Sequence, residues 1–247
     1  MKAIILAAGR GRRMARMTEE LPKCLVPLHG RPLIEWQLMA LRKAGISEIG
    51  IVGGYRIETL RRYDLTMFEN SRWSVTNMVS SLMMASPWLS QEPCLVCYSD
   101  IVYQQTAIEA LCRSSDSISI TSNNNWRKLW EARFQDPLSD AESFQKDNSG
   151  FLISIGKKSQ SLEDIEGQYM GLLKFDPQGW KSVVQCFESL KPADQDRLDM
   201  TSLLQKLLER NAPVRVLPVE SQWFEVDTES DLNLFDHYPN SNWLLDL

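Results

Sequence analysis

Long apolar runs, an excess of positive charge and a cysteine framework are all missing from this sequence. No apolar run approaches the roughly 20 residues that a membrane-spanning helix needs, so we expect no membrane association. The formal net charge of −5 argues against a surface that coats nucleic acid. The five cysteines are an odd number and too sparse for a disulfide scaffold. With no signal-peptide pattern at the N-terminus, we expect a cytoplasmic protein.

Two well-known nucleotide-binding motifs are also absent. The phosphate loop G-x-x-x-x-G-K-[ST] does not occur, which argues against a kinase or ATPase of that type. The dinucleotide fingerprint G-x-G-x-x-G lacks its third glycine because Met14 stands in that place, so a nicotinamide oxidoreductase is a distant alternative. The only two histidines, His29 and His237, lie in no recognisable catalytic triad.

Ordinary composition and a strand–helix–strand pattern predict an α/β fold. The hydrophobic content of 43% and charged content of 24% are typical of one globular domain at 247 residues. An apolar strand at 3–8, an amphipathic helix ending at Gly45 and a strand at 49–52 form one βαβ unit, which favours a mostly parallel sheet flanked by helices. We expect one domain at 1–236 and a tail at 237–247, whose Trp243-Leu244-Leu245 packs on a groove or on a partner in a homodimer.

Glycines and basic residues follow the first strand. Gly9 and Gly11 permit left-handed backbone and a close approach of N–H groups to an anion, and Arg12, Arg13 and Lys23 add positive charge. This pattern predicts a cradle for a polyphosphate at the carboxyl end of a strand. The alternative is an ordinary tight turn with solvated arginines.

Three acids are candidates for a metal site. Asp100 follows a predicted central strand, 94–98, and a carboxylate there suits Mg²⁺, although a helix N-cap is the alternative. Alternation puts Glu225 and Asp227 on one face of a later strand, where they repel each other unless a cation lies between them. Together the three acids predict a Mg²⁺ site; the alternative for the last two is an exposed strand face.

The motifs together resemble those of a known family. Leu6-Ala7-Ala8-Gly9-x-Gly11-x-Arg13, then Thr18 and Pro22-Lys23-x-Leu25-x-Pro27, closely resemble the signature of nucleotidyltransferases that activate sugar phosphates and phosphocholine. Asn70, Thr76-Asn77 and Ser81-Leu82 are similar to the phosphocholine cytidylyltransferase branch, although Thr76 or Asn77 also suits a helix N-cap. The resemblance implies a Rossmann-like domain with a small acceptor-binding extension, to which residues 124–175 contribute.

The resemblance also implies a reaction. An oxygen of a phosphate or phosphonate acceptor attacks the α-phosphorus of CTP, and pyrophosphate leaves. Lys23 stabilises the α-phosphate, Arg13 and the glycine amides hold the outer phosphates, and Mg²⁺ lies on Asp100, Glu225 and Asp227. The catalytic residues implied are Lys23, Arg13 and Asp100. The nucleotide-binding residues implied are Leu6, Ala7, Ala8, Gly9, Gly11, Arg12, Arg13, Lys23, Gly53, Tyr55, Thr76, Asn77 and Ser99.

The acceptor site is the least determined part. Trp126 and Trp130 share a predicted helical face and form either an aromatic wall for a quaternary ammonium, with Asp140 or Glu142 matching its charge, or a hydrophobic anchor for a lid. A third alternative is that Arg127 and Arg133 grip an acceptor carboxylate or phosphonate. Relatives place a lysine in a position like that of Lys157 or Lys158 against the acceptor phosphate, although an adjacent lysine pair is also typical of a solvated surface. The strand containing Tyr169 is similar to their acceptor-contacting strand.

Several functions therefore stay open within the resemblance. Phosphocholine-like, phosphonate or phosphorylated amino-acid-like acceptors come first, because the 126–142 segment is charged and aromatic. A sugar-1-phosphate nucleotidylyltransferase is second. A catalytically silent, nucleotide-binding regulatory subunit is opposed by the presence of Lys23 and all three acids.

Overall fold

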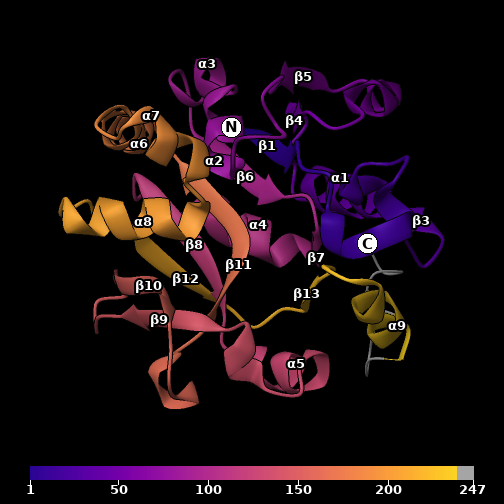
Figure 1. Cartoon of the computed structure of the whole chain (residues 1–247). Helices are drawn as coiled ribbons and strands as arrows, with labels where there is room; N and C mark the ends of the chain where they lie inside the picture. Colours follow the sequence, from indigo (N-terminus) through magenta and orange to yellow (C-terminus); the bar gives the residue numbers. More distant parts are fainter. Residues whose placement is uncertain (238–247) are drawn as a thin grey trace.

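A seven-stranded sheet crosses the middle of the structure, a computed structural model in which residues 1–237 are described (Figure 1). Four neighbouring pairs are parallel, and only β11 runs antiparallel to both neighbours. The sheet order is β12 (Arg215–Val219), β8 (Ile118–Asn123), β11 (Gln168–Phe175), β6 (Cys94–Tyr98), β1 (Lys2–Ala7), β4 (Ile49–Gly53) and β5 (Thr66–Glu69). The prediction of a mostly parallel α/β sheet is confirmed.

Helices cover both faces of this sheet, which is why its strands are apolar on both sides. Helix α1 (Leu33–Lys43) packs with α4 (Gln105–Arg113) on one face. Helices α2 (Met78–Met83), α6 (Pro177–Glu188) and α8 (Met200–Glu209) lie on the other, beside the short helices α3 (Ser86–Leu89) and α7 (Pro192–Arg197). Helix α1 is followed by Gly45 at φ 85°, the left-handed cap that the sequence predicts.

The chain reverses its order across the sheet beside β1. From β1 it adds β4 and then β5 on one side, and it later returns to place β6 on the other side. In open α/β sheets the crevice outside the carboxyl ends of strands at such a switch point binds the ligand. The loops after β1 and β6 therefore meet where a ligand is expected.

A separate extension leaves the sheet after β8. It comprises α5 (Trp126–Arg133), η4 (Pro137–Ser139), the hairpin of β9 (Glu142–Lys146) and β10 (Leu152–Lys158), and η5 (Leu162–Asp164). The chain then re-enters the central sheet as β11, so the predicted range 124–175 includes one strand that belongs to the main sheet.

Smaller elements surround the carboxyl ends of the strands. They are η1 (Arg12–Thr18), η2 (Lys23–Leu25), β2 (Pro27–Leu28) paired with β3 (Arg31–Pro32), η3 (Ile57–Tyr63), β7 (Ile101–Tyr103) paired with β13 (Trp223–Glu225), and α9 (Glu229–His237). None of the helices in residues 1–237 is both long and apolar enough to cross a bilayer. Residue 237 ends α9, whereas the rest of the predicted tail, 238–247 with Trp243-Leu244-Leu245, lies outside the described residues.

Candidate active site

The glycine loop after β1 is shaped around a lysine. Gly11 has φ 74°, and a Cβ atom at this position would lie 2.7 Å from the Cβ of Lys23. The Thr18 hydroxyl donates to the Gly11 carbonyl over 3.0 Å and closes the turn. Gly9 is not left-handed, and a Cβ atom there would meet no protein atom within 4 Å. Of the two glycines expected to be left-handed, only Gly11 adopts this conformation, and its missing side chain leaves room for Lys23.

Lys23 joins two distant segments of the chain. Its side chain is nearly buried, and its Nζ atom lies 2.7 Å from Asp100 Oδ2 and 2.6 Å from Asp227 Oδ1. Burial alone would lower the pKa of the Lys23 ammonium, but the two carboxylates outweigh burial and raise it. Lys23 is therefore a fixed positive charge at the mouth of the glycine loop.

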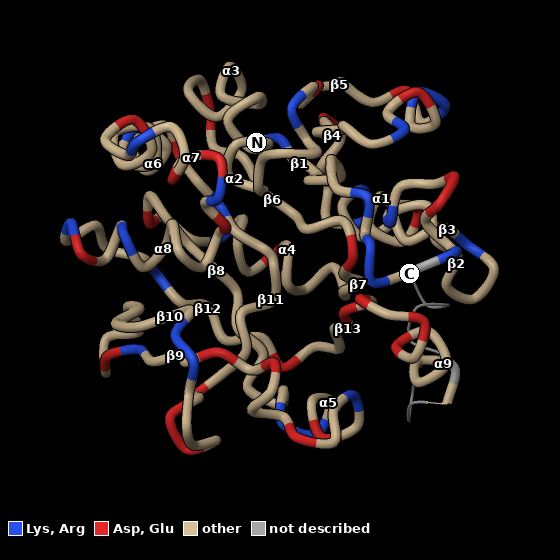
Figure 2. The backbone as a smooth tube through the Cα atoms, in the orientation of Figure 1, with Lys and Arg blue, Asp and Glu red and all other residues tan. Residues whose placement is uncertain are grey.

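Backbone and side-chain contacts bring the predicted acids together. The Val226 amide donates to the Asp100 carbonyl over 2.8 Å, which joins the loop after β6 to the end of β13. Arg133 donates to both Glu225 Oε2 (2.9 Å) and Asp227 Oδ2 (3.3 Å), so one guanidinium links the two carboxylates. The predicted strand over both acids is shorter than expected, because β13 ends at Glu225 and Asp227 lies beyond it. Basic and acidic stretches meet beside β7 and β13 in Figure 2.

Positively charged side chains, rather than contacts between the acids themselves, hold these carboxylates in place. Arg13 also donates to Asp227 Oδ1, over 2.8 Å. Within residues 1–237, no group of three or more histidine, cysteine or acidic side chains is arranged to hold a metal ion. The donor set nevertheless consists of the carboxylate oxygens that Mg²⁺ prefers, and Asp100 Oδ1 is buried without a hydrogen-bond partner. Burial and the neighbouring Asp227 raise the pKa of Glu225, against the effect of Arg133.

Arg133 does not face an open acceptor site, which corrects the predicted acceptor contact for this arginine. Its side chain is 0% exposed, and its Nε atom lies 2.9 Å from Asp231 Oδ1 in addition to the contacts with Glu225 and Asp227. Its guanidinium donors are thus used within the protein. Asp231, which the sequence did not single out, also accepts from the backbone amides of Asp227 and Thr228 over 2.9 and 2.8 Å.

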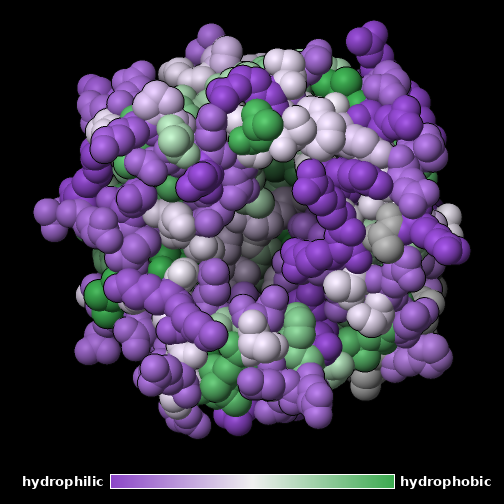
Figure 3. Space-filling view, in the orientation of Figure 1, coloured by the Kyte–Doolittle hydropathy of each residue, from purple (hydrophilic) through white to green (hydrophobic). Residues whose placement is uncertain are grey.

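A cavity of about 230 Å³ lies at this convergence, in the hollow at the centre of the face shown in Figure 3. It brings together many of the predicted residues. The lining consists of Leu6, Ala8, Gly9, Gly11, Arg13, Lys23, Trp73, Thr76, Asn77, Met78, Ser81, Ser99, Asp100 and Asp227. Trp73 and Met78 were missed, and their position inside the 70–82 motif was the available signal; Ser81 was named as part of that motif but was not among the predicted binding residues.

Four predicted nucleotide-binding residues do not line this cavity. Ala7 is buried in the sheet, and Arg12 is exposed on η1. A Cβ atom on Gly53 would meet the Ile57 side chain at 2.5 Å, so this glycine permits close packing behind the site. The Tyr55 amide donates to the Ala8 carbonyl over 2.9 Å, and its ring packs edge-on against Trp73 at 5.1 Å. Gly53 and Tyr55 therefore support the glycine loop.

Thr76 and Asn77 have structural partners as well as a place in the cavity wall. Asn77 caps α2, because its side chain accepts from the Met78 amide over 2.8 Å; its amide nitrogen donates to the Arg197 carbonyl. The Thr76 hydroxyl donates to a backbone carbonyl and accepts from Asn70. The helix-cap alternative is confirmed at Asn77, and contact of either residue with a nucleotide stays a prediction.

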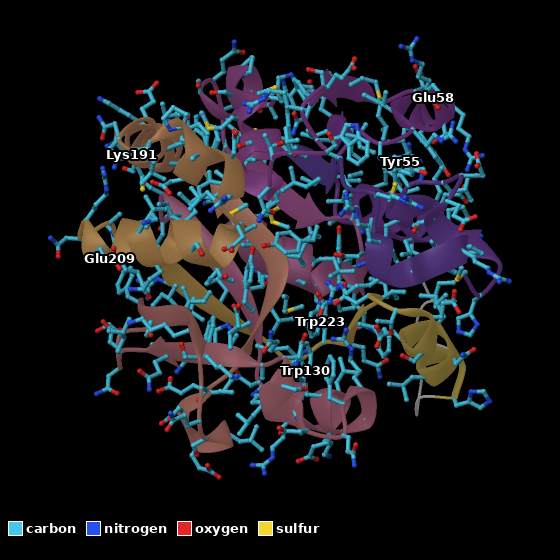
Figure 4. All side chains as sticks on the ribbon, in the orientation of Figure 1. Tyr55, Glu58, Trp130, Lys191, Glu209 and Trp223 are labelled. Atoms are coloured by element: carbon cyan, nitrogen blue, oxygen red, sulfur yellow. The ribbon has the colours of Figure 1, made fainter. Side chains whose placement is uncertain are left out.

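The predicted aromatic pair lies in the core of the extension. Trp126 is 3% and Trp130 0% exposed, and Trp130 stacks on Trp223 with ring centroids 5.6 Å apart and planes at 10° (Figure 4). The Trp130 indole donates to Asp140 over 3.2 Å, so Asp140 has a partner within the extension. This burial corresponds to the hydrophobic-anchor alternative, because neither indole presents a face to solvent.

The other predicted acceptor residues do not line the cavity. Glu142 and Lys157 are exposed on the β9–β10 hairpin. Tyr169 packs edge-on against Tyr98 at 5.8 Å, and Gly171, at φ 75°, lets Tyr98 lie directly over the β11 backbone. Acceptor binding by Glu142, Lys157 and Tyr169 stays a prediction.

Comparison with known proteins identifies the family to which a chain with this site belongs. Residues 3–159 match the profile of the MobA-like NTP transferase domain. The chain belongs to this family. It is 36% identical to a CTP:phosphoglutamine cytidylyltransferase of Campylobacter jejuni, over 95% of this chain and 98% of that protein. It is 28% identical to a 2-aminoethylphosphonate cytidylyltransferase of Lancefieldella rimae, over 95% and 92%.

A solved structure confirms the fold independently. The CTP:phosphocholine cytidylyltransferase of Streptococcus pneumoniae superimposes with a TM-score of 0.72 over 96% of this chain and 97% of its own, at 19% identity. The chain is a nucleotidyltransferase with the Rossmann-like fold that the motifs implied.

Proposed function

We propose that this nucleotidyltransferase uses CTP and Mg²⁺ to transfer CMP to a small phosphate or phosphonate acceptor, with release of pyrophosphate. The observation that carries the proposal is the Lys23 ammonium, which is held between Asp100 and Asp227 at the mouth of the glycine loop. Such a transfer needs positioning and charge neutralisation rather than a covalent nucleophile. The site supplies fixed positive charge and contains no histidine or cysteine in its lining.

The chain's own groups would have distinct roles. The Gly9–Gly11 backbone and Arg13 would bind the outer phosphates. Lys23 would stabilise charge on the α-phosphate during displacement. Asp100, Glu225 and Asp227 would hold Mg²⁺, which would neutralise phosphate charge and orient the attacking oxygen. The buried, unpartnered Asp100 Oδ1 supports this assignment.

The names of the relatives support the choice of nucleotide and acceptor class. Two relatives that align along nearly the whole chain, at 36% and 28% identity, are named as cytidylyltransferases, one of phosphoglutamine and one of 2-aminoethylphosphonate. A choline-phosphate cytidylyltransferase of Haemophilus influenzae is 37% identical over 55% of this chain. These acceptors share a phosphate or phosphonate on a small nitrogen-containing molecule, and the higher identity supports our choice of a phosphorylated amino acid as the first candidate.

Two alternative functions stay open, a different acceptor and a subunit without turnover. A sugar-1-phosphate acceptor is compatible with the fold, since a glucose-1-phosphate thymidylyltransferase of Streptomyces antibioticus aligns over 94% of this chain at 21% identity. A silent regulatory subunit would bind CTP without turnover. The presence of Lys23 with all three acids favours the catalyst.

Pyrophosphate release tests the proposal. The full chain is incubated with Mg²⁺, each of CTP, UTP, ATP and GTP, and a panel of phosphoglutamine, 2-aminoethylphosphonate, phosphocholine and glucose 1-phosphate. We expect release with CTP and a nitrogen-containing acceptor, and none after chelation of the metal. Release only with glucose 1-phosphate would favour the first alternative, and tight CTP binding without release would favour the second.

A further inference from the structure

One arginine of the extension reaches the acids of the candidate metal site. Arg133 is the last residue of α5, and its guanidinium contacts Glu225, Asp227 and Asp231, which follow it by 92 to 98 residues. These contacts span 2.9 to 3.3 Å, and the side chain is 0% exposed. Arg133 is therefore a buried connection between the extension and the C-terminal acids, rather than a surface charge.

The shape of the guanidinium suits this arrangement. Its planar fork offers five N–H donors in fixed directions, so one side chain can hold several carboxylates at set angles, whereas an ammonium acts as a point charge. Aromatic rings fix the plane of the fork, because the guanidinium carbon lies 4.7 Å from the Trp130 ring and 5.0 Å from the Phe134 ring. Trp130 is itself held by Trp223 and Asp140.

Asp231 fixes the other side of the arrangement. Its Oδ1 atom pairs with Arg133 Nε over 2.9 Å, while its Oδ2 atom accepts from the backbone amide of Asp227 over 2.9 Å. The Thr228 amide donates to the same oxygen over 2.8 Å. Asp231 thus seats Arg133 and holds the Asp227 backbone at the same time.

We propose that Arg133, seated by Asp231, is a positioning residue that sets the spacing and orientation of the Glu225 and Asp227 carboxylates for a divalent cation. The inference rests on the proposed function, since it assigns a role toward the same Mg²⁺ site. Residues that orient a metal ligand through hydrogen bonds typically contribute 10–100-fold to metal affinity or activity. The extension would then supply part of the metal site's architecture besides any contact with the acceptor.

The test measures metal affinity directly, with Mn²⁺ as the probe. Mn²⁺ accepts the same carboxylate oxygens as Mg²⁺, and its binding to the full chain without nucleotide is followed by electron paramagnetic resonance. The variants are Arg133→Lys, which keeps the charge but loses the fork, and Asp231→Asn, which replaces neither Arg133 nor a metal acid but removes the carboxylate that seats them. The matched control is Arg215→Lys, because Arg215 also stacks on an aromatic ring, Phe151, and pairs with an acid, Asp116, but lies on the far edge strand β12.

We expect the Mn²⁺ dissociation constant to rise by about 10–100-fold in both variants and to stay within about twofold of the wild-type value in Arg215→Lys. Thermal unfolding of each variant, measured in parallel, identifies a loss of folded protein. Unchanged affinity in folded Arg133→Lys and Asp231→Asn would overturn the inference. Tighter binding would also overturn it, because Arg133 would then compete with the metal.

The same measurements separate this inference from the proposed function. If wild-type protein binds Mn²⁺ and both variants weaken the binding, but no nucleotide supports pyrophosphate release, the positioning role stands and the proposed transfer fails. If CTP supports release and the variants bind Mn²⁺ like the wild type, the transfer stands and the positioning role fails. Wild-type protein that binds no Mn²⁺ would overturn the positioning role and the metal assignment together.

Discussion

Gly11 offers a sharp test of how the glycine loop is built. The substitution Gly11→Ala adds one methyl group at φ 74°, where its carbon would lie 2.7 Å from the Lys23 Cβ atom. The left-handed conformation costs a non-glycine residue about 1–2 kcal/mol. Lys23 cannot move aside freely, because Asp100 and Asp227 hold its ammonium at 2.7 and 2.6 Å. Overpacking of this kind typically costs a further 1–3 kcal/mol or so.

The expected loss is therefore about 2–5 kcal/mol in the free energy of unfolding, as the sum of the two costs. Turnover should fall as well, since a displaced Lys23 would lose its proposed place at the α-phosphate. Loss of one preorganised electrostatic contact typically lowers the rate by about 10²–10³-fold. Urea unfolding measures the first quantity, and pyrophosphate release at saturating CTP and Mg²⁺ measures the second.

Gly9→Ala is the matched control for stability. Gly9 is outside the left-handed region, and a Cβ atom there would meet nothing within 4 Å. We expect its free energy of unfolding to be unchanged or raised by about 0.4–1 kcal/mol, because alanine restricts the unfolded chain. Equal stability of the Gly11→Ala and Gly9→Ala proteins would refute the reasoning about strain and the Lys23 contact.

Three further predictions test the site and its support. Lys23→Ala should lower turnover by at least about 10²–10³-fold, as measured by pyrophosphate release, and near-normal turnover would remove Lys23 from the reaction. Trp130→Ala should lower the free energy of unfolding in urea by about 3–5 kcal/mol, whereas a rise in acceptor KM at unchanged stability would assign Trp130 to the acceptor site instead. Burial alone would raise the pKa of the Asp227 carboxyl, but Lys23, Arg13 and Arg133 outweigh it and lower that pKa. The contribution of the Asp227 carboxylate to the free energy of unfolding is therefore complete above its pKa in the unfolded chain, about 3.9. This contribution is lost as the pH falls through the lower pKa of Asp227 in the folded protein. The difference in unfolding free energy between wild type and Asp227→Asn should shrink below about pH 4, and a difference that does not change with pH would contradict the assignment.

The parts of the fold that the sequence predicted well depend on local patterns. The apolar run ending at Gly9 became β1, and the amphipathic helix before Gly45 became α1. The antiparallel direction of β11 was not predicted, because an apolar strand pattern carries no direction.

Only one of the acids could be placed from its position at a strand end. Asp100 follows β6 of the central sheet, where a ligand crevice is expected. Asp227 follows β13, which pairs with β7 outside the central sheet, and the Val226–Asp100 backbone contact brings this segment to the site. The role of Arg133 was not predictable in the same way, since it depends on contacts with residues more than 90 positions later in the chain. The burial of Trp130 was not predictable either, because helical spacing alone does not distinguish a residue that faces the core from one that faces a ligand.

The Lys23–Asp227 ion pair has a consequence for how the protein matures in the cell. Its two partners are 204 positions apart, so nearly the entire polypeptide has to emerge from the ribosome before the site exists. A nascent chain that stops before residue 225 carries the glycine turn but neither downstream acid. The proposed ligands, CTP and Mg²⁺, could therefore assist only the last stage of folding, and products of premature termination should be inert rather than weakly active.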